Sequence, residues 1–254
     1  MADKVSPRFR SVVKAAHKGE IFVPIFRSYL MEGNFPSFNI ESRGWKENER
    51  EPDGWFHPST HPTMDDRQLY YYMTEPTRMI KEQFDSTSIM AMVAGTFWHA
   101  FIQMAGLDIG LITDVEVGVE DETYRSRGSM DGLLSSGDAL EIKTMALTKM
   151  GNITDVFTFM LKCPEYYAQA QEYLRMSGRD RMVVVLVNTA YPFEMREIHV
   201  PYNASAANET CRKYTKVLQA IADQRPPAAC CMPKSKESRA CMARTVCPIA
   251  LVGK

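Results

Sequence analysis

The sequence of 254 residues contains no uninterrupted apolar run of about 18 residues, which is the length that a transmembrane helix requires. Its first twenty residues also lack the apolar segment of a secretory signal peptide. We therefore expect a protein that works in the cytoplasm and has no association with a membrane.

An excess of charge of either sign is also lacking, because 30 Lys and Arg residues stand against 31 Asp and Glu residues. This balance excludes a surface that is basic overall, so a binding site for nucleic acid would need a local basic patch or bound metal ions. With 45% hydrophobic and 24% charged residues, the composition is typical of a globular protein with one sizeable core.

Cysteine is absent from the first 162 residues and begins at Cys163. Four of the six cysteines follow the Pro226-Pro227 pair, and these are Cys230, Cys231, Cys241 and Cys247. Because a reducing cytoplasm disfavours disulfides, we expect these thiols to be either free or bound to metal.

The positions of proline divide the chain into three regions. Residues 1–85 contain many scattered prolines and predict an irregular segment that wraps or covers the core as a lid. Residues 86–225 carry regular hydrophobic periodicity and predict the core domain. Residues 226–254 form a cysteine-bearing tail beyond the proline pair.

Within the core, apolar residues at spacings of three and four predict a helix over 86–107. Three strands are predicted at 114–119, 124–134 and 139–144, and they are expected to form an antiparallel meander. A helix over 164–176, strands at 182–187 and 195–200, and a last helix over 204–222 follow. This order predicts an α/β fold, with a central mixed β-sheet flanked by helices.

The strongest chemical signal combines Asp131 with the tripeptide Glu141, Ile142 and Lys143. Alternation along a strand places Glu141 and Lys143 on one face and Ile142 on the other. Two carboxylates and a backbone carbonyl suit Mg²⁺ or Mn²⁺, and a neighbouring ammonium can orient a water or help to deprotonate it. This combination favours phosphodiester hydrolysis, although a Glu-x-Lys tripeptide by itself is more often an exposed strand face.

Four short motifs follow one another in the core, namely GxxxH at 95–99, GxxD at 128–131, ExK at 141–143 and QxxxY at 169–173. In this order, on a helix, two strands and a helix, the series resembles the RecB-like branch of the PD-(D/E)XK nucleases. That branch includes CRISPR-associated and phage RecB-like exonucleases. The resemblance implies a restriction-endonuclease-like core.

The resemblance also implies roles for individual residues. It implies that metal is bound by His99, Asp131, Glu141 and the carbonyl of Ile142. Lys143 would act on the nucleophilic water, while Gln169 and Tyr173 would line the path of the DNA. From their positions near the motifs, Arg125, Arg127, Lys149 and Lys162 are candidate phosphate contacts. The alternatives are a satisfied core histidine at position 99 and an ordinary amphipathic helix around Gln169.

Many members of that branch carry a [4Fe-4S] cluster held by one cysteine before the core and three after it, the latter spaced CxxCx5C. Cys241 and Cys247 keep the last spacing, but Ser238 occupies the middle position and Met64 or Asp65 occupies that of the first cysteine. Cys230 or Cys231 could compensate. Three alternatives therefore stay open for the tail: an iron-sulfur cluster, Zn²⁺, or reduced thiols that pack without metal.

These observations together predict a Mg²⁺- or Mn²⁺-dependent DNA exonuclease that acts on single strands or on DNA ends. The alternatives are a structure-specific endonuclease and a catalytically idle DNA-binding or assembly subunit. A third alternative is a small interaction module built on the cysteine tail. The resemblance implies recombination or CRISPR-type protein partners, and the host cytoplasm as the location if the protein is encoded by a phage.

Overall fold

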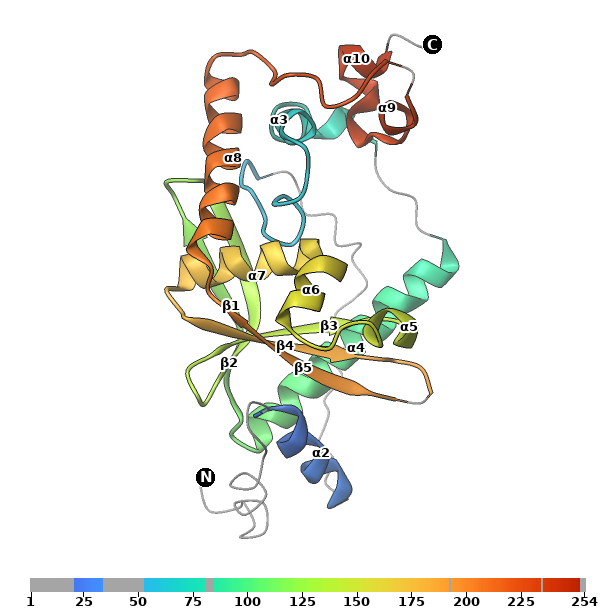
Figure 1. The fold of residues 1–254 in the computed structure, drawn as a ribbon, viewed down its shortest axis with the longest axis vertical. Helices are drawn as coiled ribbons and strands as arrows, with labels where there is room; N and C mark the ends of the chain where they lie inside the picture. Colours follow the sequence, from blue (N-terminus) through green and yellow to red (C-terminus); the bar gives the residue numbers. More distant parts are fainter. Residues whose placement is uncertain (1–20, 34–52, 81–84, 192, 234, 252–254) are drawn as a thin grey trace.

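A five-stranded mixed β-sheet lies at the centre of the computed structural model, which describes residues 21–33, 53–80, 85–191, 193–233 and 235–251 (Figure 1). Its strands are β1 (Ile112–Asp121), β2 (Ser126–Leu134), β3 (Ala139–Thr144), β4 (Arg181–Val187) and β5 (Met195–Pro201). They lie side by side in chain order, and every neighbouring pair is antiparallel except β3 and β4.

The parallel pair β3 and β4 requires a crossover connection, because after β3 the chain must return to the end of the sheet at which β3 began. Three helices make this connection: α5 (Leu147–Met150), α6 (Val156–Lys162) and α7 (Pro164–Ser177). Pro164 begins α7, and Gly178 ends it in the left-handed conformation with φ 66°. The predicted α/β fold with a mixed sheet flanked by helices is therefore confirmed.

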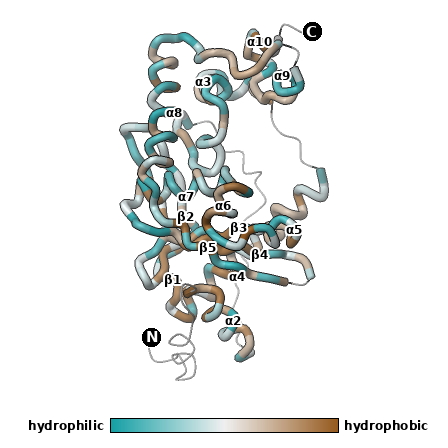
Figure 2. The backbone as a smooth tube through the Cα atoms, in the orientation of Figure 1, coloured by the Kyte–Doolittle hydropathy of each residue, from teal (hydrophilic) through white to brown (hydrophobic). Residues whose placement is uncertain are grey.

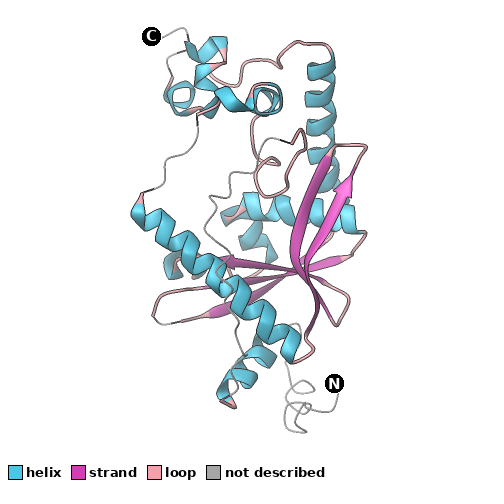
Figure 3. Cartoon of the chain, turned by 180° about the vertical axis from the view of Figure 1, so that it is seen from behind, coloured by secondary structure: helices cyan, strands magenta, loops and turns pink. Residues whose placement is uncertain are grey.

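Helices cover both faces of the sheet. α2 (Val23–Met31) and α4 (Ser86–Asp108) lie on one face, whereas α6 and α7 lie on the other (Figures 1 and 3). Alternate residues of β3 and β4 point to the two faces, so that Ile142 joins the first core and Val184 the second. Figure 2 shows the hydrophobic colouring concentrated along these strands.

Helix α4 is the longest helix in the described part of the chain. It begins at the cap Asp85, whose side chain accepts the Ser88 N–H at 2.7 Å. Among the described residues it is also the one helix that is long and apolar enough, by length and composition, to cross a membrane. Its second half packs on the sheet through Phe101 and Ile102, as expected of a core helix, whereas Met90 in its first half is exposed.

Three further helical segments meet the tail at one end of the molecule, away from the sheet (Figure 1). These are α3 (Asp66–Thr74), η2 (Pro76–Arg78) and α8 (Ala204–Ala222), and the tail adds α9 (Lys236–Ala240), η3 (Met242–Thr245) and α10 (Pro248–Leu251). A separate core forms here, in which Leu69 of α3, Tyr214 of α8 and Val246 of the tail are buried together.

The prediction of an irregular segment over 1–85 is wrong for two stretches, because the structure has α2 and α3 there. In α3 the side chain of Asp65 caps the Arg67 N–H at 2.9 Å, and Tyr70 and Tyr71 are buried in the core at this end. Aromatic residues have modest helix propensity, so tertiary packing decides the conformation of this segment.

Candidate active site

The candidate site lies where strands β2 and β3 separate. Their ladder is limited to the pairs Gly132 with Leu140 and Leu133 with Ala139. Beyond it, the side chain of Asp131 enters the gap, and its Oδ2 accepts the backbone N–H of Ile142 at 2.6 Å. A carboxylate thus takes the place of a strand partner, and this contact fixes Asp131 beside the Glu-x-Lys tripeptide.

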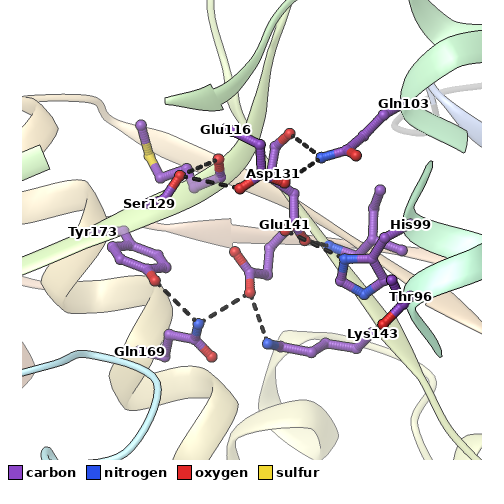
Figure 4. Close-up of polar contacts among 12 residues, drawn as sticks. Thr96, His99, Gln103, Glu116, Ser129, Asp131, Glu141, Lys143, Gln169 and Tyr173 are labelled. Atoms are coloured by element: carbon purple, nitrogen blue, oxygen red, sulfur yellow. Dashed lines mark hydrogen bonds and ion pairs between the residues drawn. The ribbon is translucent and has the colours of Figure 1, made fainter. Parts of the chain in front are cut away.

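Glu141 is almost completely buried in the same gap, with 5% of its surface exposed (Figure 4). Its Oε1 lies 2.7 Å from Lys143 Nζ and accepts the Gln169 Nε2–H at 3.0 Å. Its Oε2 is buried and has no hydrogen-bond partner among the described residues. Burial, together with the charge of Asp131, raises the pKa of Glu141 to about 7.

Lys143 is also largely buried, with 16% of its side chain exposed. Burial alone would lower the pKa of Lys143, but the adjacent carboxylate of Glu141 outweighs burial and raises it. The side chain is therefore a cation at neutral pH, and it opposes the pKa rise of Glu141. The alternation predicted for the tripeptide accounts for this pair.

His99 reaches the site from α4, and its Nδ1 lies 3.3 Å from Oδ1 of Asp131. Burial alone would lower the pKa of His99, but the hydrogen bond and the charge of Asp131 raise it. One turn earlier, a Cβ at Gly95 would lie only 3.1 Å from Thr144 Oγ1. The glycine of the GxxxH motif therefore allows α4 to approach the end of β3 closely.

Two residues at the site were not assigned a function from the sequence, Gln103 and Glu116. Gln103 Nε2 donates to the backbone oxygen of Asp131 at 2.8 Å and to Glu116 Oε1 at 3.0 Å. Glu116 has φ 51°, in the left-handed region that a glutamate rarely adopts within a strand, and its other carboxylate oxygen lies 3.4 Å from Ser129 Oγ. A third carboxylate thus lies beside Asp131 (Figure 4).

The QxxxY residues lie beside Glu141. Both are buried, Gln169 with 4% and Tyr173 with 3% exposed, and Gln169 Nε2 lies 3.4 Å from the Tyr173 hydroxyl. In this arrangement their side chains support Glu141 from the side of α7, and their lining of the DNA path stays a prediction. Their i, i+4 spacing puts both on the buried face of the helix.

Gly128 of the GxxD motif is packed against Tyr173. A Cβ at this position would lie 2.8 Å from Tyr173 Cε1 and 3.1 Å from its hydroxyl. If the site cleaves DNA, as the resemblance implies, Gly128→Ala should displace the tyrosine ring and Gln169 and lower the cleavage rate about tenfold or more, because small misplacements of supporting groups are costly. Initial cleavage rates on labelled DNA measure the effect.

Gly118→Ala is the matched control for this prediction, because Gly118 is paired with Ser129 on the neighbouring strand and a Cβ there would meet nothing within 4 Å. It should leave the rate unchanged. A Gly128→Ala protein as active as the parent would show that the packing of Tyr173 does not matter to the site.

Arg127 lies farther along β2, four residues from Asp131 and thus about 13 Å away along the strand. Its guanidinium is 2.7 Å from Asp53 Oδ2 and 5.1 Å from the centre of the Trp55 ring. Burial alone would raise the pKa of Asp53, but hydrogen bonds from the Trp55 backbone, Arg127 and His57 lower it to about 2. The charge of Arg127 is therefore neutralised within the protein.

Arg127 and Asp53 border a surface hollow of about 840 Å³ that also includes Gly128 and Ser129. Arg125 lies just before β2, is exposed and has φ 49°. Among the described residues, neither arginine contacts Asp131 or Glu141. Phosphate binding by Arg125 and Arg127 stays a prediction.

The tail cysteines lie close to α3 and α8. Cys247 is buried, and its Sγ accepts the Arg67 Nε–H at 3.3 Å. Burial and the neighbouring Asp65 raise the pKa of Cys230 to about 12. Over the described part of the chain, no three His, Cys, Asp or Glu side chains are gathered closely enough to hold one metal ion. Binding of a cluster or Zn²⁺ by Cys230, Cys231, Cys241 and Cys247 stays a prediction, which iron and zinc analysis of the purified protein would test.

Comparison of the sequence with protein-family models and with curated proteins gives no match. Solved structures do match. The crystal structure of SSO0001 has a TM-score of 0.50 and 14% identity, over 91% of this chain and 98% of that one. The alkaline exonuclease LHK-Exo from Laribacter hongkongensis has a TM-score of 0.50 and 16% identity, over 67% of this chain and 89% of its own. At these identities the comparison shows the fold, and for the fold it confirms the resemblance seen in the sequence.

Proposed function

We propose that this chain, whose fold is that of an alkaline exonuclease, is a PD-(D/E)XK nuclease that hydrolyses DNA phosphodiester bonds with Mg²⁺ or Mn²⁺. The observation that carries the proposal is the buried Oε2 of Glu141, which has no hydrogen-bond donor among the described residues. The negative charge of Asp131 also acts on this carboxylate. A site that concentrates negative charge in this way is suited to a divalent cation.

The types of donor atom suit such a cation, although in this structure His99, Asp131 and Glu141 are not gathered closely enough to hold one ion. We assign the metal to His99, Asp131, Glu141 and the carbonyl of Ile142, of which the oxygen atoms are the hard ligands that Mg²⁺ and Mn²⁺ prefer. His99 now contacts Asp131, and Glu141 contacts Lys143 and Gln169, so the carboxylates would exchange some of these contacts for the ion. The chemistry that a bound ion supplies is a lower pKa for a coordinated water and neutralisation of charge on the phosphate.

The residues of the chain have distinct parts in the proposed reaction. Water attacks phosphorus, the bond to the 3′ oxygen breaks, and that oxygen takes up a proton, which leaves a 5′-phosphate and a 3′-hydroxyl. Lys143, as an ammonium, donates to Glu141 and faces the developing negative charge, so it orients rather than deprotonates. Gln169 donates to the same oxygen of Glu141 and so helps to fix the carboxylate.

Exonuclease action on single strands or DNA ends is our preferred form, and the name of the structural neighbour LHK-Exo favours it. A structure-specific endonuclease would use the same site. An idle DNA-binding or assembly subunit would retain the fold, but the presence of Asp131, Glu141 and Lys143 together favours an enzyme. A cytoplasmic location and recombination or CRISPR-type partners are proposed from the resemblance alone.

Cleavage of linear and circular DNA tests these alternatives. With Mn²⁺, the protein should degrade end-labelled linear DNA and leave covalently closed circles of the same sequence intact, and EDTA should abolish the activity. Cleavage of circles would establish the endonuclease instead. Retention of DNA in a binding assay without any cleavage, in Mg²⁺ and in Mn²⁺, would favour the idle subunit.

A further inference from the structure

The ring of Tyr166, on α7, is shared by two lysines at the edge of the candidate site. Lys143 Nζ lies 4.8 Å from the centre of the ring, and Lys149 Nζ lies 5.3 Å from it. Each lysine also faces a carboxylate: Lys143 is 2.7 Å from Glu141, and Lys149 is 3.4 Å from Glu165. The aromatic ring therefore joins a buried ion pair to a half-exposed one.

The two ammonium groups carry like charge, and both lie close to the centre of the same ring. The face of an aromatic ring carries partial negative charge, and it attracts a cation within about 6 Å of its centre. This attraction is strongest where water is excluded, which is the case for Lys143, with 16% of its side chain exposed. Lys149, with 43% exposed, is screened to a greater extent.

The flexible side chain of Lys143 has four rotatable bonds, and the proposed reaction requires its ammonium at one place. Glu141 supplies one contact, but a single ion pair leaves the ammonium free to rotate around the carboxylate. The Tyr166 ring supplies a second contact from another direction, since it belongs to α7 and Glu141 belongs to β3. Two contacts from two elements define the position of the ammonium.

We propose that Tyr166 is a positioning residue, whose aromatic face holds Lys143 in its reactive place and keeps Lys149 beside it. The role belongs to the ring and not to the hydroxyl, since the ring centre is what both ammonium groups approach. This inference rests on the proposed nuclease function.

Kinetics of three variants test the proposal. Tyr166→Leu removes the aromatic face, and we expect kcat to fall about tenfold with KM within about twofold, as the loss of one desolvated cation-π contact implies. Tyr166→Phe keeps the ring and should retain kcat within about twofold. Tyr167→Leu is the matched control on the same helix, and it should leave kcat unchanged, because the Tyr167 hydroxyl accepts the Asn203 Nδ2–H at 3.3 Å and its side chain packs against the second core.

A double-mutant cycle separates positioning from a general effect on the fold. In the Lys143→Met background, Tyr166→Leu should cause no further fall in kcat, because the group that it positions is gone. A further tenfold fall in that background, or an equal fall in Tyr166→Phe and Tyr166→Leu, would overturn the proposal.

A spectroscopic measurement keeps the test independent of nuclease activity. In protein with ¹³C-labelled lysine, the ε-CH2 signals of Lys143 and Lys149, identified by substitution with Arg, should be shifted by the ring current and should move toward ordinary values in Tyr166→Leu but not in Tyr166→Phe. If the wild-type protein shows these shifts and cleaves no DNA, the proposed function fails and the contact stands. If the shifts are absent, the contact itself is refuted.

Discussion

Glu141→Gln should lower the rate of DNA cleavage about a thousandfold or more while the protein remains folded. The substitution keeps the size of the side chain, but it removes the negative charge that the proposed cation requires. The amide oxygen can still accept from Lys143 and Gln169, which both contact Oε1 of Glu141, while the amide NH2 takes the place of the buried Oε2. Initial rates on end-labelled linear DNA in Mn²⁺ measure the loss.

Thermal unfolding in EDTA provides the control for folding. Because burial raises the pKa of Glu141 to about 7, the ionised carboxylate is unfavourable in the folded protein without metal. A neutral amide avoids this cost but leaves the buried Lys143 ammonium without its ionic partner, so the two effects oppose each other and the melting temperature of Glu141→Gln should lie within about 5 °C of the parental value. Glu209→Gln, on the exposed face of α8, should leave both quantities unchanged. A folded Glu141→Gln protein that cleaves DNA at the parental rate would refute the proposed site.

Glu197→Ala should destabilise the protein by about 3 kcal/mol, through the loss of one buried carboxylate. From β5, Glu197 accepts the backbone N–H groups of Ile21, Phe22 and Val23 at 2.6, 2.8 and 2.9 Å, at the beginning of α2. These groups have no intrahelical acceptor, because they belong to the first turn or precede it. The helix that depends on them buries Phe22 and Phe26 against the sheet. Urea unfolding at pH 7 measures the loss.

The effect of Glu197→Ala should depend on pH. Burial alone would raise the pKa of Glu197, but hydrogen bonds from His199 and from the three backbone groups outweigh it and lower this pKa. A carboxyl with a lowered pKa in the folded state stabilises the protein above its unfolded pKa of about 4.3, and this contribution is lost as the pH falls toward the folded value. The difference between parent and Glu197→Ala should therefore shrink below about pH 4.

Glu120→Ala removes an exposed glutamate from β1 and serves as the control for a change of charge on a strand. It should change the free energy of unfolding by less than about 0.5 kcal/mol at pH 7 and at about pH 3.5. A loss in Glu197→Ala that stays constant between pH 7 and pH 3.5 would mean that packing, and not the ionised carboxylate, stabilises the start of α2.

The sequence predicts the core of this fold well, because its elements are long and strongly periodic. The helix predicted over 86–107 is α4, Ser86–Asp108, and the last predicted helix has the bounds of α8, Ala204–Ala222. The helices α5 and α6 were not predicted, since they span 4 and 7 residues and show little periodicity. In α3 the burial of Tyr70 and Tyr71 depends on contacts with segments far away in the sequence.

The candidate site could be predicted where residue types and alternation decide the geometry, and not where long-range partners decide it. The placement of Glu141 and Lys143 on one side of β3 follows from the strand period. The ion pair of Arg127 with Asp53 joins residues that are 74 positions apart, so no local sequence pattern predicts it. The left-handed backbone conformation of Glu116 could not be predicted either, because its residue type and its strand context both favour an extended backbone.

The hydrogen bond from the Ile142 N–H to Asp131 has a consequence for the evolution of this fold. Asp131 replaces the partner that Ile142 lacks on the β2 side, so the protein needs an acceptor there whether or not it cleaves DNA. Glu141 accepts no backbone N–H group in the contacts described above, and its buried, unpartnered oxygen lowers the stability of the protein when no metal is bound. In a descendant that abandoned catalysis, we expect position 141 to become neutral first, while Asp or Asn persists at position 131 as a trace of the ancestral enzyme.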